Sequence, residues 1–132
     1  MAGGAREIKR RIRSVSNIGK VTRAMEFRGA RYVHIHVPCP LGWGAAPENT
    51  IRLARLAVES GLYPLFEAHD GQVTARTPIR RKVAVDEYLK LQKRFAHLFA
   101  TPAGRARIEL IQAAADRNIA EFDLLPTENA DG

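Results

Sequence analysis

The chain has 132 residues, of which 45% are hydrophobic and 7% aromatic, and it carries a formal net charge of +7. This length and composition predict a single soluble globular domain and exclude a disordered chain. Its single cysteine excludes an internal disulfide and predicts a cytoplasmic setting. No apolar run approaches the ~20 residues that cross a bilayer, and no apolar core of a signal peptide follows the basic N-terminus, so membrane insertion is not expected.

The positive charge is concentrated at the N-terminus. Residues 1–31 contain nine of the 21 Lys and Arg residues but two of the 14 Asp and Glu residues, so they account for the whole excess of +7. Such an asymmetry predicts a basic arm joined to a neutral domain.

The basic arm is predicted to be an amphipathic helix over residues 5–27. Apolar residues recur every three or four positions, at Ile8, Ile12, Val15, Ile18, Val21 and Met25. The opposite face carries Arg and Lys, which would suit a nucleic acid or an anionic membrane surface. No aromatic residue precedes Phe27 to stack on bases or anchor in lipid. We therefore favour a solvated basic face on a helix whose apolar stripe docks on a protein partner, and expect no nucleic-acid binding.

The segment after this helix reads as a strand that ends in a rigid loop. Residues 32–37 alternate Tyr32, His34 and His36 with Val33, Ile35 and Val37, the period of a β-strand. Pro38 and Pro40 then prevent continuation on either side of Cys39. Gly42 and Gly44 flank the only tryptophan, Trp43, and permit tight turns around it.

The rest of the chain predicts helices and one hairpin. A helix should begin near Asn49 or Thr50 and end at Gly61. Residues 62–68 and 72–77 predict a hairpin, since Asp-Gly is a favoured tight-turn pair. Residues 85–98 include a short helix, and Thr101-Pro102 begins a last one. In the helix before the hairpin, the side chains expected to face the core are those of Ile51, Leu53, Ala54, Ala57 and Val58. In the last helix they are those of Ile108, Leu110, Ile111, Ala115 and Ile119.

Three separated motifs carry a family resemblance. They are Pro38-Cys-Pro-Leu-Gly-Trp43, the stretch of residues 49–67 that begins Asn-Thr-Ile-Arg-Leu, and the stretch of residues 85–98 that contains Leu-Gln-Lys-Arg-Phe. Together they resemble the C-terminal part of the β subunit of 2-oxoacid:ferredoxin oxidoreductases, the pyruvate synthase family, over residues 20–122. The resemblance implies an oxidative decarboxylation of a 2-oxoacid to an acyl-coenzyme A, with electrons passed to ferredoxin.

The resemblance also implies cofactors and site residues. In the family this subunit binds thiamine diphosphate with magnesium and a four-iron four-sulfur cluster. Cys39 corresponds to the last of the four cluster ligands, so it is the one cofactor-binding and metal-binding residue expected here. The residues that would shape the loop around it are Pro38, Pro40, Gly42 and Trp43. The implied partners are the other oxidoreductase subunits and, through them, ferredoxin.

This chain departs from the family pattern in ways that argue against independent catalysis. The three other cysteine ligands are missing. The nearest match to the family's Gly-Asp-Gly diphosphate motif is His69-Asp70-Gly71, which reads as a turn without the Asn that should follow it. No catalytic residue is identified, and the chain alone is expected to be inactive and to bind neither cofactor. By residue type alone, an isolated cysteine is usually a small buried hydrophobe.

A zinc site is a separate possibility for the same region. His34 and His36 share one face of the predicted strand and could chelate zinc together with Cys39. No fourth ligand is evident, so we favour two partly exposed strand histidines. His69 and His97 are interpreted as structural.

A second resemblance covers the N-terminus. Residues 1–15 and Lys20-Val-Thr-Arg-Ala-Met-Glu26 resemble the first stalk helix of the ATP synthase γ subunit. The pattern stops after Phe27, and the matching C-terminal stalk helix is not evident. It implies docking to ATP synthase α and β subunits as an alternative, structural role.

The prediction is a mixed α/β chain with three parts. Residues 1–28 form the basic amphipathic helix, and residues 126–132 form a flexible tail. Residues 29–125 form a fragment of a thiamine-diphosphate-binding-type subunit, with a core strand, a β-hairpin and flanking helices. The function predicted is that of a truncated or hybrid β-subunit fragment of a pyruvate:ferredoxin oxidoreductase; the alternative is a rotor stalk fragment.

Overall fold

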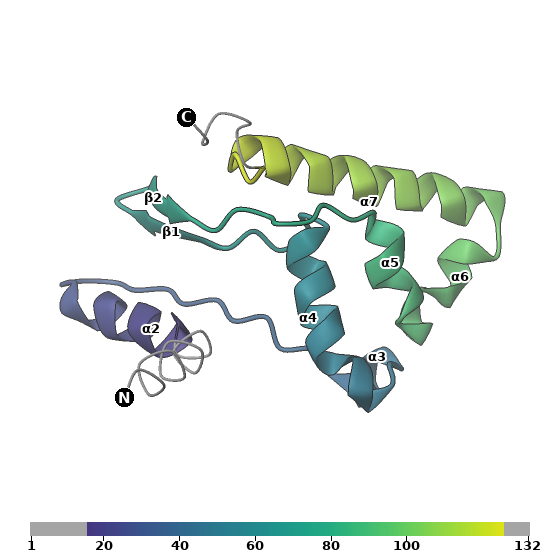
Figure 1. The fold of residues 1–132 in the computed structure, drawn as a ribbon, viewed down its shortest axis with the longest axis horizontal. Coiled ribbons are helices and arrows are strands. Elements are labelled where there is room, and N and C mark those ends of the chain that lie inside the picture. Colours follow the sequence, from purple (N-terminus) through teal and green to yellow (C-terminus); the bar gives the residue numbers. More distant parts are fainter. Residues whose placement is uncertain (1–15, 126–132) are drawn as a thin grey trace, which may run out of the picture. The chain divides into compact units, whose positions relative to one another are not determined.

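The computed structural model describes residues 16–125 and divides into two units, residues 1–35 and residues 36–132 (Figure 1). In the first unit, helix α2 spans Ser16–Glu26 and is the described part of the predicted basic helix; residues 5–15 of that prediction lie outside the described residues. Its apolar residues Ile18, Val21 and Met25 are exposed at helical spacing. The chain leaves the helix through Gly29, whose φ of 101° few other residues adopt.

The strand predicted for residues 32–37 is wrong. Residues 30–39 have no regular secondary structure, although the rings of Tyr32 and His34 lie 6.1 Å apart, as alternation on one face requires. A strand also needs a neighbour for its backbone hydrogen bonds. The sheet of the described residues consists of β1 and β2, which pair with each other and leave residues 30–39 without a ladder.

The second unit is built mainly from helices. Its elements are α3 (Pro40–Trp43), the 3₁₀ turn η1 (Pro47–Asn49), α4 (Thr50–Glu59), β1 (Phe66–His69), β2 (Gln72–Arg76), α5 (Val85–Lys90), the 3₁₀ turn η2 (Lys93–Phe95), α6 (Ala96–Phe99) and α7 (Pro102–Glu121). Helix α7 begins where predicted, because the Thr101 hydroxyl accepts a hydrogen bond from the Gly104 amide at 3.0 Å.

Helices α4, α5 and α7 pack together to form the main core (Figure 1). Its most buried side chains are those of Leu53, Leu56, Ala57, Val85, Leu89 and Ala115. A smaller cluster joins Ile79 and Leu124 to the end of α7 at Ile119. Two residues predicted to face inward do not: Ile51 is 65% exposed and Leu110 is 70% exposed.

The hairpin prediction is confirmed, although β1 spans Phe66–His69 and not the predicted residues 62–68. Strands β1 and β2 pair antiparallel, and His69 lies opposite Gln72 across a two-residue turn. Asp70 and Gly71 both have positive φ, 49° and 76°, which defines the mirror-image turn that suits strand twist. The hairpin is small and its strands are largely exposed. The described fold is therefore mostly helical, with one two-stranded antiparallel sheet.

Helices α4 and α7 approach closely at Gly61. This residue has a φ of 80°, and a Cβ added to it would lie 2.6 Å from Ile119 Cγ1 and 2.9 Å from the Ala115 carbonyl oxygen. The Gly61 carbonyl accepts a hydrogen bond from the Asn118 side chain at 2.9 Å. The glycine that was predicted to end α4 therefore also allows the second long helix to cross it.

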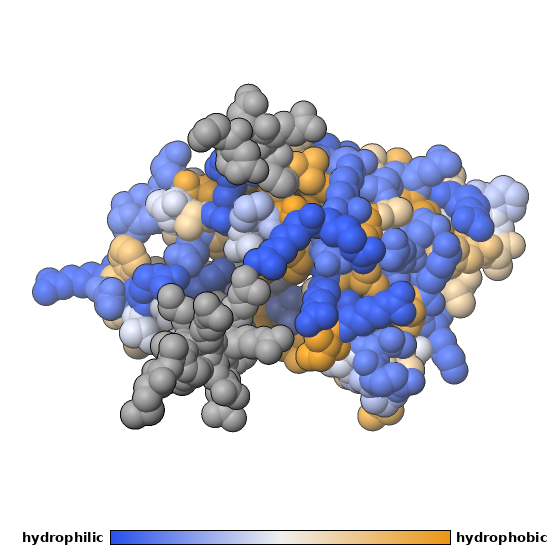
Figure 2. Space-filling model, in the orientation of Figure 1, coloured by the Kyte–Doolittle hydropathy of each residue, from blue (hydrophilic) through white to orange (hydrophobic). Residues whose placement is uncertain are grey.

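The hydropathy of the surface and of the helices bears on whether the described residues could enter a membrane. The face turned to the reader in Figure 2 is mostly hydrophilic, with hydrophobic residues visible between the hydrophilic ones. Among the residues that the structure describes, no helix has the length and apolar character needed to span a membrane.

Candidate functional site: the cysteine loop

The cysteine loop, residues 38–44, is a compact turn of defined shape. Cys39 is extended, with φ −108° and ψ 102°, and Pro40 begins α3 directly after it. The Trp43 amide donates to the Cys39 carbonyl at 3.0 Å, and the Ala45 amide donates to the Pro40 carbonyl at 2.9 Å. Proline at the first helical position has no amide to leave unsatisfied, which is why the turn can begin there.

The thiol of Cys39 is exposed and is not part of a disulfide. A Cβ added to Gly42 would lie 3.4 Å from its sulfur. The loop therefore presents the thiol at its surface, next to a position where any side chain larger than hydrogen would contact it. Pro38, on the other side of Cys39, is buried.

Aromatic rings surround the start of the loop. The His36 ring has its centroid 4.9 Å from that of Tyr63, 5.6 Å from that of Trp43 and 6.4 Å from that of Tyr88. His36 is partly exposed, as predicted, but it does not lie on a strand. Its neighbours are rings, which favours a packing role.

The segment after α5 contacts the other side of the loop. The Lys93 amide donates to the Gly44 carbonyl at 3.3 Å. The Arg94 guanidinium carbon lies 4.0 Å from the centroid of the Trp43 ring and 4.7 Å from that of Phe95. Sequence reasoning placed Lys93 and Arg94 only within residues 85–98 and did not connect them with the loop. The one signal for them was that Arg94 precedes an aromatic residue.

The described residues do not form a complete metal site. They contain no group of three His, Cys, Asp or Glu side chains placed to hold an ion. A four-iron cluster usually requires four cysteine ligands, and the whole chain contains one. The residues present therefore do not fit a complete cluster. His69-Asp70-Gly71 forms the hairpin turn, as predicted, rather than a diphosphate motif.

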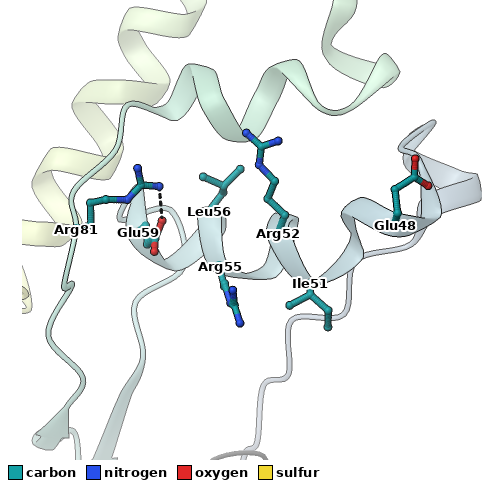
Figure 3. Close-up of a pocket in the computed structure, with 7 residues that line it drawn as sticks. All are labelled: Glu48, Ile51, Arg52, Arg55, Leu56, Glu59 and Arg81. Carbon is teal, nitrogen blue, oxygen red and sulfur yellow. Dashed lines mark hydrogen bonds and ion pairs between the residues drawn. The ribbon is translucent and has the colours of Figure 1, made fainter.

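A shallow hollow on α4 is a weaker candidate. It has a volume of about 390 Å³ and is lined by Glu48, Ile51, Arg52, Arg55, Leu56, Glu59 and Arg81. Arg81 pairs with Glu59 at 3.2 Å, whereas Arg52 and Arg55 point to opposite sides of α4 (Figure 3). Charged groups that do not converge cannot coordinate one ligand, so we place the candidate site at the cysteine loop.

The comparisons with known proteins support one of the two resemblances. The chain is 44% identical to the pyruvate synthase subunit PorB of Methanosarcina barkeri over 107 residues, which are 81% of this chain and 36% of that subunit. It is 50% identical to the PorB subunit of Methanothermobacter thermautotrophicus over 92 residues, 68% of this chain and 31% of that subunit. It is 37% identical to the ketoisovalerate oxidoreductase subunit VorB of Pyrococcus abyssi over 81 residues, 60% of this chain and 26% of that subunit. No family model matches the chain.

The chain is much shorter than these relatives. The chain spans about a third of the length of the curated PorB subunits that it matches. None of the three bears on the γ-subunit resemblance, which rests largely on residues outside the described range and stays a prediction. Over most of its length, this chain is similar to the PorB and VorB subunits of 2-oxoacid oxidoreductases.

Proposed function

We propose that this chain is a fragment of the β subunit of a 2-oxoacid:ferredoxin oxidoreductase, the part that carries the cysteine loop. The observation that supports this most is the 44% identity to a pyruvate synthase subunit over 107 residues. The parent reaction is the oxidative decarboxylation of a 2-oxoacid such as pyruvate to an acyl-coenzyme A, with electrons passed to ferredoxin. The similarity to both pyruvate and ketoisovalerate enzymes supports the reaction class more than any one 2-oxoacid.

In this proposal Cys39 supplies one ligand to an iron–sulfur cluster. Its thiol is exposed on a loop with a defined backbone, as a ligand to a shared group needs to be. The remaining ligands, and the site for thiamine diphosphate with magnesium, would come from the two thirds of the subunit that this chain does not contain. When bound, the cluster would transfer electrons; this chain's part is to present a single thiolate.

The proposal makes the rest of the subunit the first partner of this chain. Residues 32–37 have the alternation of a strand but pair with no strand of the described chain, and Val33, Ile35 and Val37, which share one face, are exposed. A strand in the rest of the subunit would supply the missing backbone hydrogen bonds and cover this apolar face. The other oxidoreductase subunits and ferredoxin would follow as partners of the assembled enzyme.

Catalysis by the isolated chain tests this proposal. The purified chain, supplied anaerobically with pyruvate, coenzyme A and a viologen dye, should give no dye reduction above a buffer blank. A complete PorB-containing enzyme from Methanosarcina barkeri, assayed in parallel, serves as the positive control. Dye reduction by the chain alone, at a rate that depends on pyruvate and coenzyme A, would overturn the fragment proposal.

A further inference from the structure

Arg94 contacts two aromatic rings and a buried polar side chain. Its guanidinium lies over the rings of both Trp43 and Phe95, at 4.0 and 4.7 Å from their centroids. Its Nε donates a hydrogen bond to the Gln92 side-chain oxygen at 2.9 Å. The contact with Trp43 joins Arg94 to the cysteine loop, which lies far away in the sequence, and the contacts with Phe95 and Gln92 fix Arg94 within its own segment.

Gln92 is a rigid support for this arginine. It is 1% exposed, and its side-chain nitrogen donates a hydrogen bond at 2.8 Å to the carbonyl of Tyr88, which lies in the last turn of α5. A buried polar side chain is retained only where its hydrogen bonds are made, and here one of them is made to Arg94. The orientation of Arg94 is thus set by the core of the second unit.

A backbone contact reinforces the same junction. The Lys93 amide donates to the Gly44 carbonyl at 3.3 Å, one residue before Arg94 and one residue after Trp43. A Cβ on Gly44 would lie 2.7 Å from the Lys93 Cβ, so the two segments approach as closely as a glycine permits. Side-chain stacking and backbone contact therefore join the same two segments.

We infer that Arg94 is a positioning residue for Cys39: by stacking on Trp43, it fixes the cysteine loop against η2 and sets the direction in which the thiol is presented. Trp43 lies four residues from Cys39 and donates its amide to the Cys39 carbonyl, so fixing the indole also fixes the backbone that carries the sulfur. That the Cys39 thiol so positioned serves as a cluster ligand rests on the proposed function. The positioning of Cys39 by Arg94 does not depend on it.

The stack requires arginine rather than any positive charge. A guanidinium is planar and can lie flat on an indole while its edge donates to Gln92. A lysine ammonium can lie near a ring, but it is compact and strongly hydrated and has no planar edge that donates to Gln92 while it stacks. Arg94→Lys should therefore loosen the cysteine loop as Arg94→Gln does, although it conserves the charge.

The test uses the fact that the chain has one cysteine, so that a nitroxide spin label on Cys39 reports on this loop alone. The line shape of its electron paramagnetic resonance spectrum is compared in the full chain, in Arg94→Gln and in Arg94→Lys. Arg107→Gln is the matched control, since Arg107 is exposed on α7 and has no described contact with the loop. Circular dichroism and thermal unfolding confirm that each variant is folded.

Both Arg94 variants should increase the mobile fraction of the label about two- to fivefold, the factor expected for losing one exposed cation–π contact, while the control leaves it unchanged. Trp43→Leu should raise it similarly, and adding Arg94→Gln to Trp43→Leu should give little further change. Unchanged label mobility in Arg94→Gln, an equal rise in the control, or full additivity would each overturn the positioning role. None of these outcomes depends on a cofactor, so they leave the proposed function to its own test.

Discussion

At the scale of single residues, the site is defined by Cys39 and Trp43, each the only residue of its type in the chain. Sequence reasoning identified both, along with the prolines and glycines around them, because these residue types restrict or free the backbone wherever they occur. It did not identify Arg94, because no local pattern indicates which distant ring an arginine will contact. That contact depends on how the segment after α5 packs against the loop.

Asp116 provides a prediction at the same scale. A hydrogen bond from Lys82, at 2.7 Å, and the charge of that ammonium lower the pKa of the Asp116 carboxyl, against a smaller opposing effect of burial. A carboxyl whose pKa is lower in the folded state stabilises the fold at pH values above its unfolded pKa, and this contribution disappears as the pH falls through its folded pKa.

Lys82→Met should therefore lower the free energy of unfolding by about 0.2–1 kcal/mol at pH 7, the range for an exposed ion pair. The loss should shrink as the pH falls below the ordinary carboxyl pKa of 3.8 and on through the lower pKa of Asp116 in the folded chain. Urea unfolding across this pH range measures it. Arg117→Met, on the exposed side of α7, should show no such pH-dependent loss. A loss that keeps its full size once Asp116 is protonated would show that Lys82 acts through packing instead.

At the scale of secondary-structure elements, local signals predicted what local chemistry determines. The Asp70-Gly71 turn, the end of α4 at Gly61 and the Thr101 cap of α7 all follow from residue types at fixed offsets. The strand at residues 32–37 did not form, because alternation specifies which side chains share a face but cannot supply a neighbouring strand. Ile51 and Leu110 are apolar at helical spacing yet lie outside the stripe that the other helices cover.

Gly61 tests how closely α4 and α7 must approach. Gly61→Ala should lower the free energy of unfolding by about 2–4 kcal/mol, because a Cβ is strained at this φ and also overlaps Ile119. Gly71→Ala is the control for strain alone: its φ of 76° is similar, but nothing lies within 4 Å of the added Cβ. It should cost about 1 kcal/mol. Equal losses in the two variants, measured by urea unfolding, would mean that α7 moves away at no cost.

At the scale of the whole molecule, the described residues combine a packed core with apolar side chains that are exposed. Helices α4, α5 and α7 bury a continuous set of side chains, whereas the apolar residues of α2 and of residues 30–37 are exposed. The relatives are about three times as long as the segment they share with this chain. The proposed subunit fragment would account for both facts, because the rest of the subunit would then cover the apolar faces.

The γ-subunit resemblance gives a competing explanation for one of these surfaces. The apolar stripe Ile18, Val21 and Met25 on α2 has the spacing of a helix that docks on another helix. If the N-terminal helix were the functional part, the chain would bind ATP synthase α and β subunits and ignore oxidoreductase subunits. The two explanations therefore differ in the partner they require.

The most direct test is anaerobic assembly with the missing part of a PorB subunit. The tagged chain is coexpressed with Methanosarcina barkeri PorB from which the matching segment has been deleted, and the captured complex is analysed for protein and iron. We expect the two chains to copurify with cluster iron, and Cys39→Ser to copurify equally well but with the iron lost or greatly reduced. Capture of ATP synthase α and β subunits in place of the truncated PorB, or copurification with an iron content that Cys39→Ser leaves unchanged, would contradict the account.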